Sequence, residues 1–200
     1  MARGNKANLI FGYGINDYTG SVFINKKNIK SYTTWRDMLK RCYSEEYHSK
    51  HQSYIGCYVC EEWKYYTNFK KWYDNNYPHD LASTGIIFNL DKDLLVDGNK
   101  KYGPDTCVFL PQKINRFLST KYKNNSSGMV GVVFHKATNK FLAQANSFVT
   151  GKQIHLGLFT NKETAKESYD YFRSINVLHA KEYLRDLGYN EDIVNKLGGR

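Results

Sequence analysis

The sequence lacks any apolar run near the roughly 18 residues that a transmembrane helix needs. Its first residues, MARGNKANLIFGYG, also lack the apolar segment and small-residue cleavage site of a secretion signal. With only four cysteines, a disulfide-rich secreted domain is not expected either. These absences predict a soluble intracellular protein, located in the cytoplasm and not associated with a membrane.

Acidic residues are missing from one long stretch, residues 119–160. The whole chain has 29 Lys and Arg against 19 Asp and Glu, which gives a net charge of +10. Much of the excess lies in this acid-free block and in residues 1–30. The lysines of the block are Lys121, Lys123, Lys136, Lys140 and Lys152. Such a local excess predicts a polyanionic partner, with nucleic acid as the first choice and an anionic membrane surface as the alternative.

The first patterned region combines helices with a pair of strands. Residues 33–43 place apolar side chains on one helical face, and residues 61–77 do the same with aromatic rings. Residues 86–90 and 106–111 are strand candidates on either side of a polar loop, and a helix is expected to have Pro111 in its first turn. The expected order is therefore two helices, a strand, a loop, a strand and a helix.

A polar segment, KNNSSG at residues 123–128, has the composition of a linker. Three strand candidates with short turns follow it, and then a helix with Thr160 as N-cap and Glu163 completing a capping box. We therefore predict an α+β fold in which a three-stranded antiparallel sheet packs on one C-terminal helix. The expected parts are a basic arm at 1–30, a first domain at 31–122, the linker at 123–128 and a second domain at 129–200.

Strand alternation divides the predicted sheet into a face that packs on the helix and a face that is open to solvent. On the middle strand, Phe141, Ala143 and Ala145 are expected to face the helix. The open face then collects amides, imidazoles and lysines without any acid: His135, Lys136, Lys140, Gln144, Asn146, Lys152, Gln153 and His155. Because amides pair with base edges and lysines neutralise phosphates, this face is predicted to bind double-stranded DNA.

The segment GVVFHKATNKFLAQANSFVTGKQIHLGLFTNKETAKESYDYF resembles the Apetala-type DNA-binding domain of plant ethylene-response factors, which also occurs in phage and bacterial nucleases. The resemblance lies in Gly131, Val132, Phe141, Ala143, Leu156, Gly157, Phe159, Thr160, Glu163 and Ala165. It implies a sheet that lies in the major groove. Where the plant family uses Arg and Trp, this chain has Val133 and the amides and imidazoles above. Fewer arginines imply a weaker or a different base preference, so the specificity of the plant family is not carried over.

The segment FNLDKDLLVDGNKKYGPDTCVFLPQKIN resembles the ββα-metal core of HNH endonucleases. Together with YTTWRDMLKRCY and VCEEW, it makes the chain similar to phage HNH-like or homing-type endonucleases that carry an Apetala-type domain. The resemblance implies a Mg²⁺ or Mn²⁺ ion held by a carboxylate after the first strand and by an Asn on the helix. Asp91, Asp93 and Asn115 occupy these places, and Asp105 or Asn99 could fill the middle of the motif.

Histidine is absent from this segment, although the HNH family uses one to take the proton from water. Lys92 stands in its place, and a lysine holds phosphate but is a poor base at neutral pH. The catalytic candidates are Asp91, Lys92, Asp93 and Asn115. Three alternatives follow: a metal-bound water without a dedicated base, a base supplied by His51 or His79, or a silent scaffold that only helps to bind DNA.

The cysteines include a C-x2-C pair, Cys57 and Cys60, which has the spacing of half a zinc site. Cys42 and Cys107 could complete a four-thiolate shell. Both lie where small buried residues are expected, so buried reduced thiols are the favoured interpretation and structural zinc the alternative.

The sequence as a whole predicts a phage-type, Mg²⁺-dependent DNA endonuclease of the host bacterial cytoplasm, with duplex DNA as partner and no small-molecule substrate. The first alternative is a catalytically silent DNA-binding protein with a regulatory or accessory role. The second is an RNA-binding protein that stacks bases on exposed aromatic rings such as Tyr65 and Tyr66.

Overall fold

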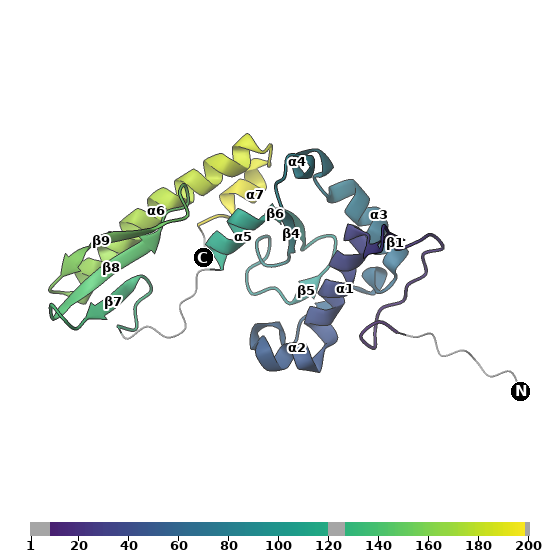
Figure 1. Ribbon diagram of the computed structural model, residues 1–200, viewed down its shortest axis with the longest axis horizontal. Helices are drawn as coiled ribbons and strands as arrows, with labels where there is room; N and C mark the ends of the chain where they lie inside the picture. Colours follow the sequence, from purple (N-terminus) through teal and green to yellow (C-terminus); the bar gives the residue numbers. More distant parts are fainter. Residues whose placement is uncertain (1–8, 120–126, 199–200) are drawn as a thin grey trace, which may run out of the picture. The chain divides into compact units, whose positions relative to one another are not determined.

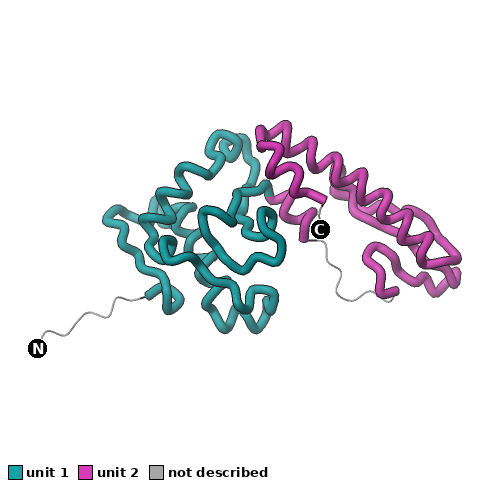
Figure 2. Tube along the Cα trace, turned by 180° about the vertical axis from the view of Figure 1, so that it is seen from behind, with its two compact units in different colours: residues 1–111 teal, residues 112–200 magenta. Residues whose placement is uncertain are grey.

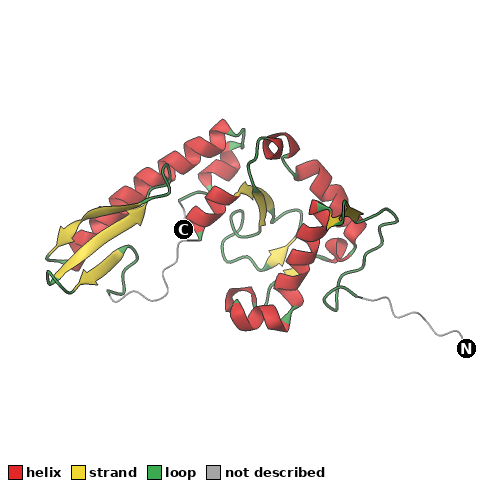
Figure 3. Ribbon diagram, viewed as in Figure 1, coloured by secondary structure: helices red, strands yellow, loops and turns green. Residues whose placement is uncertain are grey.

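The computed structural model describes residues 9–119 and 127–198 (Figure 1). The chain divides into two compact units, residues 1–111 and residues 112–200 (Figure 2). Both units contain helices and strands (Figure 3), so the mixed α+β composition predicted from the sequence is confirmed. Residues 1–8 of the expected basic arm and most of the expected linker at 123–128 lie outside the described residues.

The first unit begins with a small antiparallel hairpin, β1 (Phe23–Ile24) and β2 (Lys27–Asn28). Its two-residue turn, Asn25 and Lys26, has φ angles of 50° and 63°. Two consecutive positive φ angles are characteristic of a turn whose twist matches that of the flanking strands.

Two helices, α1 (Lys30–Tyr43) and α3 (Tyr66–Asn76), supply half of the buried aromatic residues of this unit. Trp35 is fully buried, and its indole N–H donates to the carbonyl of Trp63 at 2.7 Å. Helix α1 extends three residues before the expected helical segment, residues 33–43. The helix begins at Lys30 without a side-chain cap, and the Thr34 hydroxyl donates to the Lys30 carbonyl at 2.9 Å.

The short helices of the first unit are α2 (Glu45–Lys50), η1 (Gln52–Tyr54), η2 (Glu61–Lys64) and α4 (His79–Ser83). Its strands form two pairs. The antiparallel pair, β4 (Phe88–Asp91) and β6 (Val108–Pro111), corresponds to the two strands expected around the polar loop. The parallel pair is β3 (Tyr58–Val59) with β5 (Lys101–Tyr102).

Helix α5 (Gln112–Leu118) follows β6 directly in the sequence but belongs to the second unit. Within that unit, the Lys113 ammonium lies 4.4 Å from the ring centroid of Phe148, and the Arg173 guanidinium lies 3.7 Å from that of Phe117. These cation–π contacts attach α5 to the C-terminal elements. A ββα-metal core, which requires this helix together with the β4–β6 hairpin, therefore stays a prediction.

The second unit contains the predicted three-stranded antiparallel sheet, in the order β7 (Val132–His135), β8 (Lys140–Asn146) and β9 (Gln153–Phe159). Helix α6 (Lys162–Asp186) runs along one face of this sheet, and α7 (Glu191–Asn195) follows (Figure 1). The N-cap of α6 is Asn161, whose side chain accepts from the N–H groups of Glu163 and Thr164. The prediction of Thr160 as cap was therefore wrong by one residue.

The interface between the sheet and α6 is built from small residues. Val132, Ala143 and Ala165 are completely buried, and Phe141, Leu156 and Phe159 pack around them. Just before β7, the backbone of Gly131 has a φ of 81°, and a Cβ there would lie 1.9 Å from the Tyr169 ring on α6. Close approach of the helix thus requires both the missing side chain and the left-handed backbone of glycine.

Asn176 of α6 fixes the turn between β8 and β9. Its side chain is 2% exposed, accepts from the Phe148 N–H at 2.8 Å and donates to the Asn146 carbonyl at 3.1 Å. A buried amide with both groups paired holds the end of β8 in one position. Within the described ranges, the structure contains no helix long and apolar enough to cross a membrane.

Substitution of Gly131 by Ala is expected to destabilise the second unit by roughly 2–5 kcal/mol, because it combines backbone strain with overlap on Tyr169. The matched control is Gly151→Ala, at a φ of 70° but with open space around its Cβ. The control substitution should lower the free energy of unfolding by only about 1 kcal/mol, the cost of placing alanine in a left-handed backbone conformation. Urea unfolding followed by circular dichroism measures both, and equal losses would contradict the close approach.

Candidate nucleic-acid interface

Cross-strand pairing arranges the predicted DNA-binding residues in rows on the open face of the second unit's sheet. His135 pairs with Lys140 across β7 and β8. Gln144 pairs with His155, and Asn146 pairs with Gln153, across β8 and β9. Because directly opposed residues point to the same face, the cation, imidazole and amide groups are neighbours.

A β-bulge in β9 makes this arrangement possible. Gly157 pairs with Ala143 and His155 pairs with Gln144, which leaves Leu156 as an extra residue between them. The extra residue reverses the alternation, so Ile154 and Phe159 both lie on the helix side although five positions separate them. The φ of 140° at Gly157 is a conformation that other residues rarely adopt.

The lysines of the open face and its edges carry charges that no acid neutralises. Lys136, Lys140 and Lys152 are exposed, and none has an ion-pair partner among the described residues. On α6, by contrast, Lys166 pairs with Asp170 at 2.5 Å. Lys121 and Lys123 lie outside the described part of the chain. The described lysines of the acid-free block are thus available to an external anion.

The two histidines of the open face differ in their surroundings. The Nδ1 of His135 lies 2.9 Å from the hydroxyl of Thr138 in the turn after β7, and this contact orients the ring. His155 is exposed at the start of β9, opposite Gln144. Both rings present a nitrogen that can donate or accept, depending on the tautomer.

An apolar row crosses the middle of the same face, and only its first member, Val133, is among the positions at which the plant family contacts DNA. Val133 pairs with Leu142, and Leu142 pairs with Leu158, so the three side chains lie side by side. Leu158 is 44% exposed. Strict alternation from Ile154 and Leu156 would have placed Leu158 against the helix, and only the bulge reveals its position.

The second candidate site, Asp91-Lys92-Asp93, lies at the end of β4 in the first unit. One carboxylate oxygen of Asp91 accepts from the N–H groups of Asp93 at 3.0 Å and Leu94 at 2.7 Å. This pattern is an Asx turn, in which the side chain closes the backbone where the strand ends. At least one role of Asp91 is therefore structural.

Lys92 is buried, with 6% of its surface exposed. Its amino group donates to the Asn99 carbonyl at 2.8 Å and pairs with Asp93. The Asn99 side chain in turn donates to the carbonyls of Lys92 and Lys101, at 2.6 and 2.7 Å. Lys92 and Asn99 thus hold the two ends of the polar loop together, and the ammonium group points into the protein instead of toward solvent.

The remaining nuclease candidates occupy several elements. Asp105 pairs with Lys101 at 3.0 Å, and Asn115 lies on α5 in the second unit. The ring of His51 stacks on Tyr47 with centroids 4.3 Å apart, and His79 packs edge-on against Tyr77 at 5.0 Å. Both histidines are thus held by aromatic neighbours.

The fit of a metal ion to these residues is partial. Asp91 and Asp93 supply carboxylate oxygens, the donor type that Mg²⁺ binds. Across the described ranges, no group of three or more His, Cys, Asp or Glu side chains is placed to hold a metal ion. An amide oxygen such as that of Asn115, or an oxygen of a bound substrate, is a further type of ligand, so the Mg²⁺ prediction stays a prediction.

All four cysteines are free, and Cys42, Cys57 and Cys107 are buried. They do not gather into a metal-binding group of the described chain. Burial raises the pKa of the Cys42 and Cys107 thiols to about 12, and it raises the pKa of Cys57 and Cys60 as well. Thiols of this kind are protonated at neutral pH and behave as small apolar side chains.

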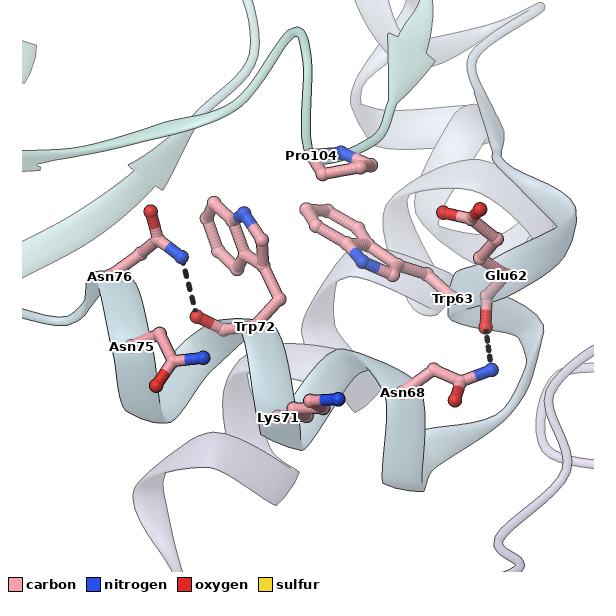
Figure 4. A pocket seen from close by; sticks show the side chains of 8 residues that line it. All are labelled: Glu62, Trp63, Asn68, Lys71, Trp72, Asn75, Asn76 and Pro104. Atoms are coloured by element: carbon pink, nitrogen blue, oxygen red, sulfur yellow. Dashed lines mark hydrogen bonds between the residues drawn. The ribbon is translucent and has the colours of Figure 1, made fainter.

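A surface pocket of about 380 Å³ lies beside α3 in the first unit (Figure 4). The indole rings of Trp63 and Trp72, 4.7 Å apart between centroids, form its wall below Pro104. Two of its amides are already used: Asn68 donates to the Glu62 carbonyl and Asn76 to the Trp72 carbonyl. The pocket includes none of the predicted site residues.

Of the two tyrosines proposed for base stacking, only Tyr65 is exposed. Tyr66 is fully buried, and its hydroxyl lies 2.7 Å from that of Ser31. The expectation that Tyr66 is exposed was therefore wrong, because its ring belongs to the core between α1 and α3. Tyr65 is 38% exposed.

Comparison of the chain with protein-family models, with curated proteins and with solved structures finds no match.

Alkylation of the native protein by iodoacetamide at neutral pH is expected to modify only Cys60, the one cysteine that is partly exposed. The other three are buried, so the reagent does not reach their sulfur atoms, whereas Cys60 is accessible and is expected to react slowly because its pKa is also raised. Mass spectrometry after denaturation counts the modified sites, and labelling of all four in urea is the control. Equally fast labelling of Cys42 or Cys107 in the native protein would contradict this burial.

Proposed function

We propose that the protein binds double-stranded DNA through the open face of the β7–β8–β9 sheet. The observation that carries the proposal is the combination of unneutralised lysines with rows of amides and imidazoles on a face without a carboxylate. Lysines supply attraction to phosphates whatever the sequence, and amides supply hydrogen bonds to base edges. A merely solvated protein face normally carries charges of both signs.

The dimensions of the sheet support a position in the major groove. Neighbouring strands are about 4.8 Å apart, so three strands span about 10 Å, and the groove is about 12 Å wide. With β8 in the centre, Gln144 and Asn146 would face the base edges. Lys136 and Lys152 lie in the turns at opposite ends of β8, where phosphates would pass.

Metal-dependent cleavage of the bound DNA, as the resemblance to HNH-like endonucleases implies, is the second candidate function. The side chain of Asp93 is 44% exposed beside Asp91, so a hard-oxygen ligand is accessible at the expected place. The burial of Lys92 and the turn closed by Asp91 favour the alternative, a DNA-binding protein in which this segment is structural. We therefore propose DNA binding as the first function of the protein and DNA cleavage as the second.

Replacement of Lys140 by Ala is expected to weaken DNA binding and to reduce the slope of log affinity against log salt concentration by about 0.9, because one phosphate contact is lost. Fluorescence anisotropy of a labelled duplex over a salt series measures the slope. The matched control is Lys166→Ala, which removes a lysine already paired with Asp170. The proposal fails if the two variants change the slope equally or if the wild type does not bind duplex DNA.

For cleavage, the expected result is nicking of supercoiled plasmid in the presence of Mg²⁺ or Mn²⁺. Asp93→Asn should lower the rate roughly 100-fold, since a neutral amide is a poor ligand for a hard cation. Asp91→Asn should do the same while its amide oxygen still closes the turn. The control is Asp74→Asn, on α3, where the carboxylate pairs with Lys70.

Absence of nicking by the wild type, or equal nicking by all four proteins, would leave the DNA-binding role without catalysis. The anisotropy assay with the same variants shows whether binding is intact, and this separates loss of chemistry from loss of affinity.

A further inference from the structure

The apolar row of Val133, Leu142 and Leu158 lies in the middle of a face that is otherwise polar. All three residues are on the side away from α6, because their chain neighbours Val132, Ala143 and Phe159 pack against the helix. Leu158 has 44% of its surface exposed. None of the three belongs to the buried core of the sheet and helix.

The surroundings of the row indicate what covers it. Toward one end of β8 the next open-face pair is His135 with Lys140, and toward the other it is Gln144 with His155. An apolar protein partner would have to bury these polar groups and the unneutralised lysines beside them, at a large cost in desolvation. A DNA major groove offers phosphates to the lysines, base edges to the amides, and one apolar group, the C5-methyl of thymine.

We propose that Leu142 and Leu158 contact thymine methyl groups and make the protein prefer thymine-containing sites. This inference rests on the proposed DNA binding and adds a specificity determinant to it. Contact between an aliphatic side chain and the methyl removes apolar surface of both from water. Cytosine presents no methyl at this position and adenine and guanine present only polar edges, so the row discriminates between bases.

The spacing along β8 extends the inference to the neighbouring positions. Leu142 and Gln144 are two residues apart on the same face, which corresponds to about 7 Å in a strand. This distance is about two base-pair steps of 3.4 Å along the duplex. Because the Gln side chain suits adenine, a thymine contacted by Leu142 is expected about two steps from an adenine contacted by Gln144.

The test compares thymine with uracil, which pairs identically and lacks only the methyl. Duplexes that the full-length protein enriches from a random-sequence pool are synthesised again with deoxyuridine in place of thymidine. We expect the dissociation constant to rise about fourfold for each contacted methyl. Leu142→Asn and Leu158→Asn should each reduce the preference for thymine about fourfold, and the double variant should bind the thymine and uracil duplexes equally. The matched control is Val149→Asn in the turn after β8, where an exposed valine lies outside the row, and it should keep the preference.

The results distinguish failure of the methyl contact from failure of DNA binding as a whole. Equal affinity of the wild type for thymine and uracil duplexes overturns the methyl contact and leaves DNA binding intact. Failure to bind any duplex overturns both. If the wild type elutes as a dimer in gel filtration and Leu158→Asn converts it to a monomer, the row is an interface between copies of the chain and the inference is wrong. The wild-type comparison needs no variant, so it remains decisive even if a substitution prevents folding.

Discussion

The close contact between α6 and the sheet is the constraint on which the second unit depends. Ala143 and Ala165 are completely buried there, and no larger side chain would let the helix approach so closely. Because the helix covers one face of the sheet, alternate strand residues on either side of the bulge are left on the other face, away from the helix. The polar rows and the apolar row with Leu158 are therefore both exposed because α6 packs on the opposite face. A site built in this way is rigid, since its side chains project from paired strands and not from a loop.

Much of this unit could be predicted from its sequence, because hydrophobic alternation and turn composition are local signals. The three strands, the long helix and the polar members of the open face follow from them. The bulge does not, because the apolar residues Ile154, Leu156, Leu158 and Phe159 fit no single alternation. Pairing with β8 resolves the conflict by leaving Leu156 unpaired, and Gly157 supplies the unusual backbone angle. The position of Leu158 is hence a tertiary result, and local pattern alone assigns it to the wrong face.

In the first unit, the roles of the candidate site residues depend on tertiary contacts that the local sequence pattern does not reveal. In the sequence, Asp91-Lys92-Asp93 is a run of charges after a strand, a pattern equally typical of a metal site and of a solvated turn. The structure adds Asn99, which is seven residues from Lys92 and binds its carbonyl while Lys92 binds that of Asn99. Such reciprocal bonds allow a lysine to be buried at low cost, because its donors are satisfied. Similarly, α5 belongs to the second unit because the Arg173 guanidinium, 56 residues later, packs on the Phe117 ring and donates to its carbonyl.

Exposed lysines without an ion-pair partner among the described residues occur in both units, for example Lys26 and Lys71 in the first, but those of the sheet share a face that has no acid. In the first unit, Lys50, Lys64, Lys70 and Lys101 each pair with an acid three or four residues away, so their charges are largely cancelled locally. On the sheet, the absence of any acid leaves the lysine charges without such compensation. A field that attracts polyanions therefore originates at the open face whatever Asp91 and Asp93 do. The proposed binding and the proposed cleavage thus rest on different units, and loss of a catalytic function in the first unit would leave the charge of the open face unchanged.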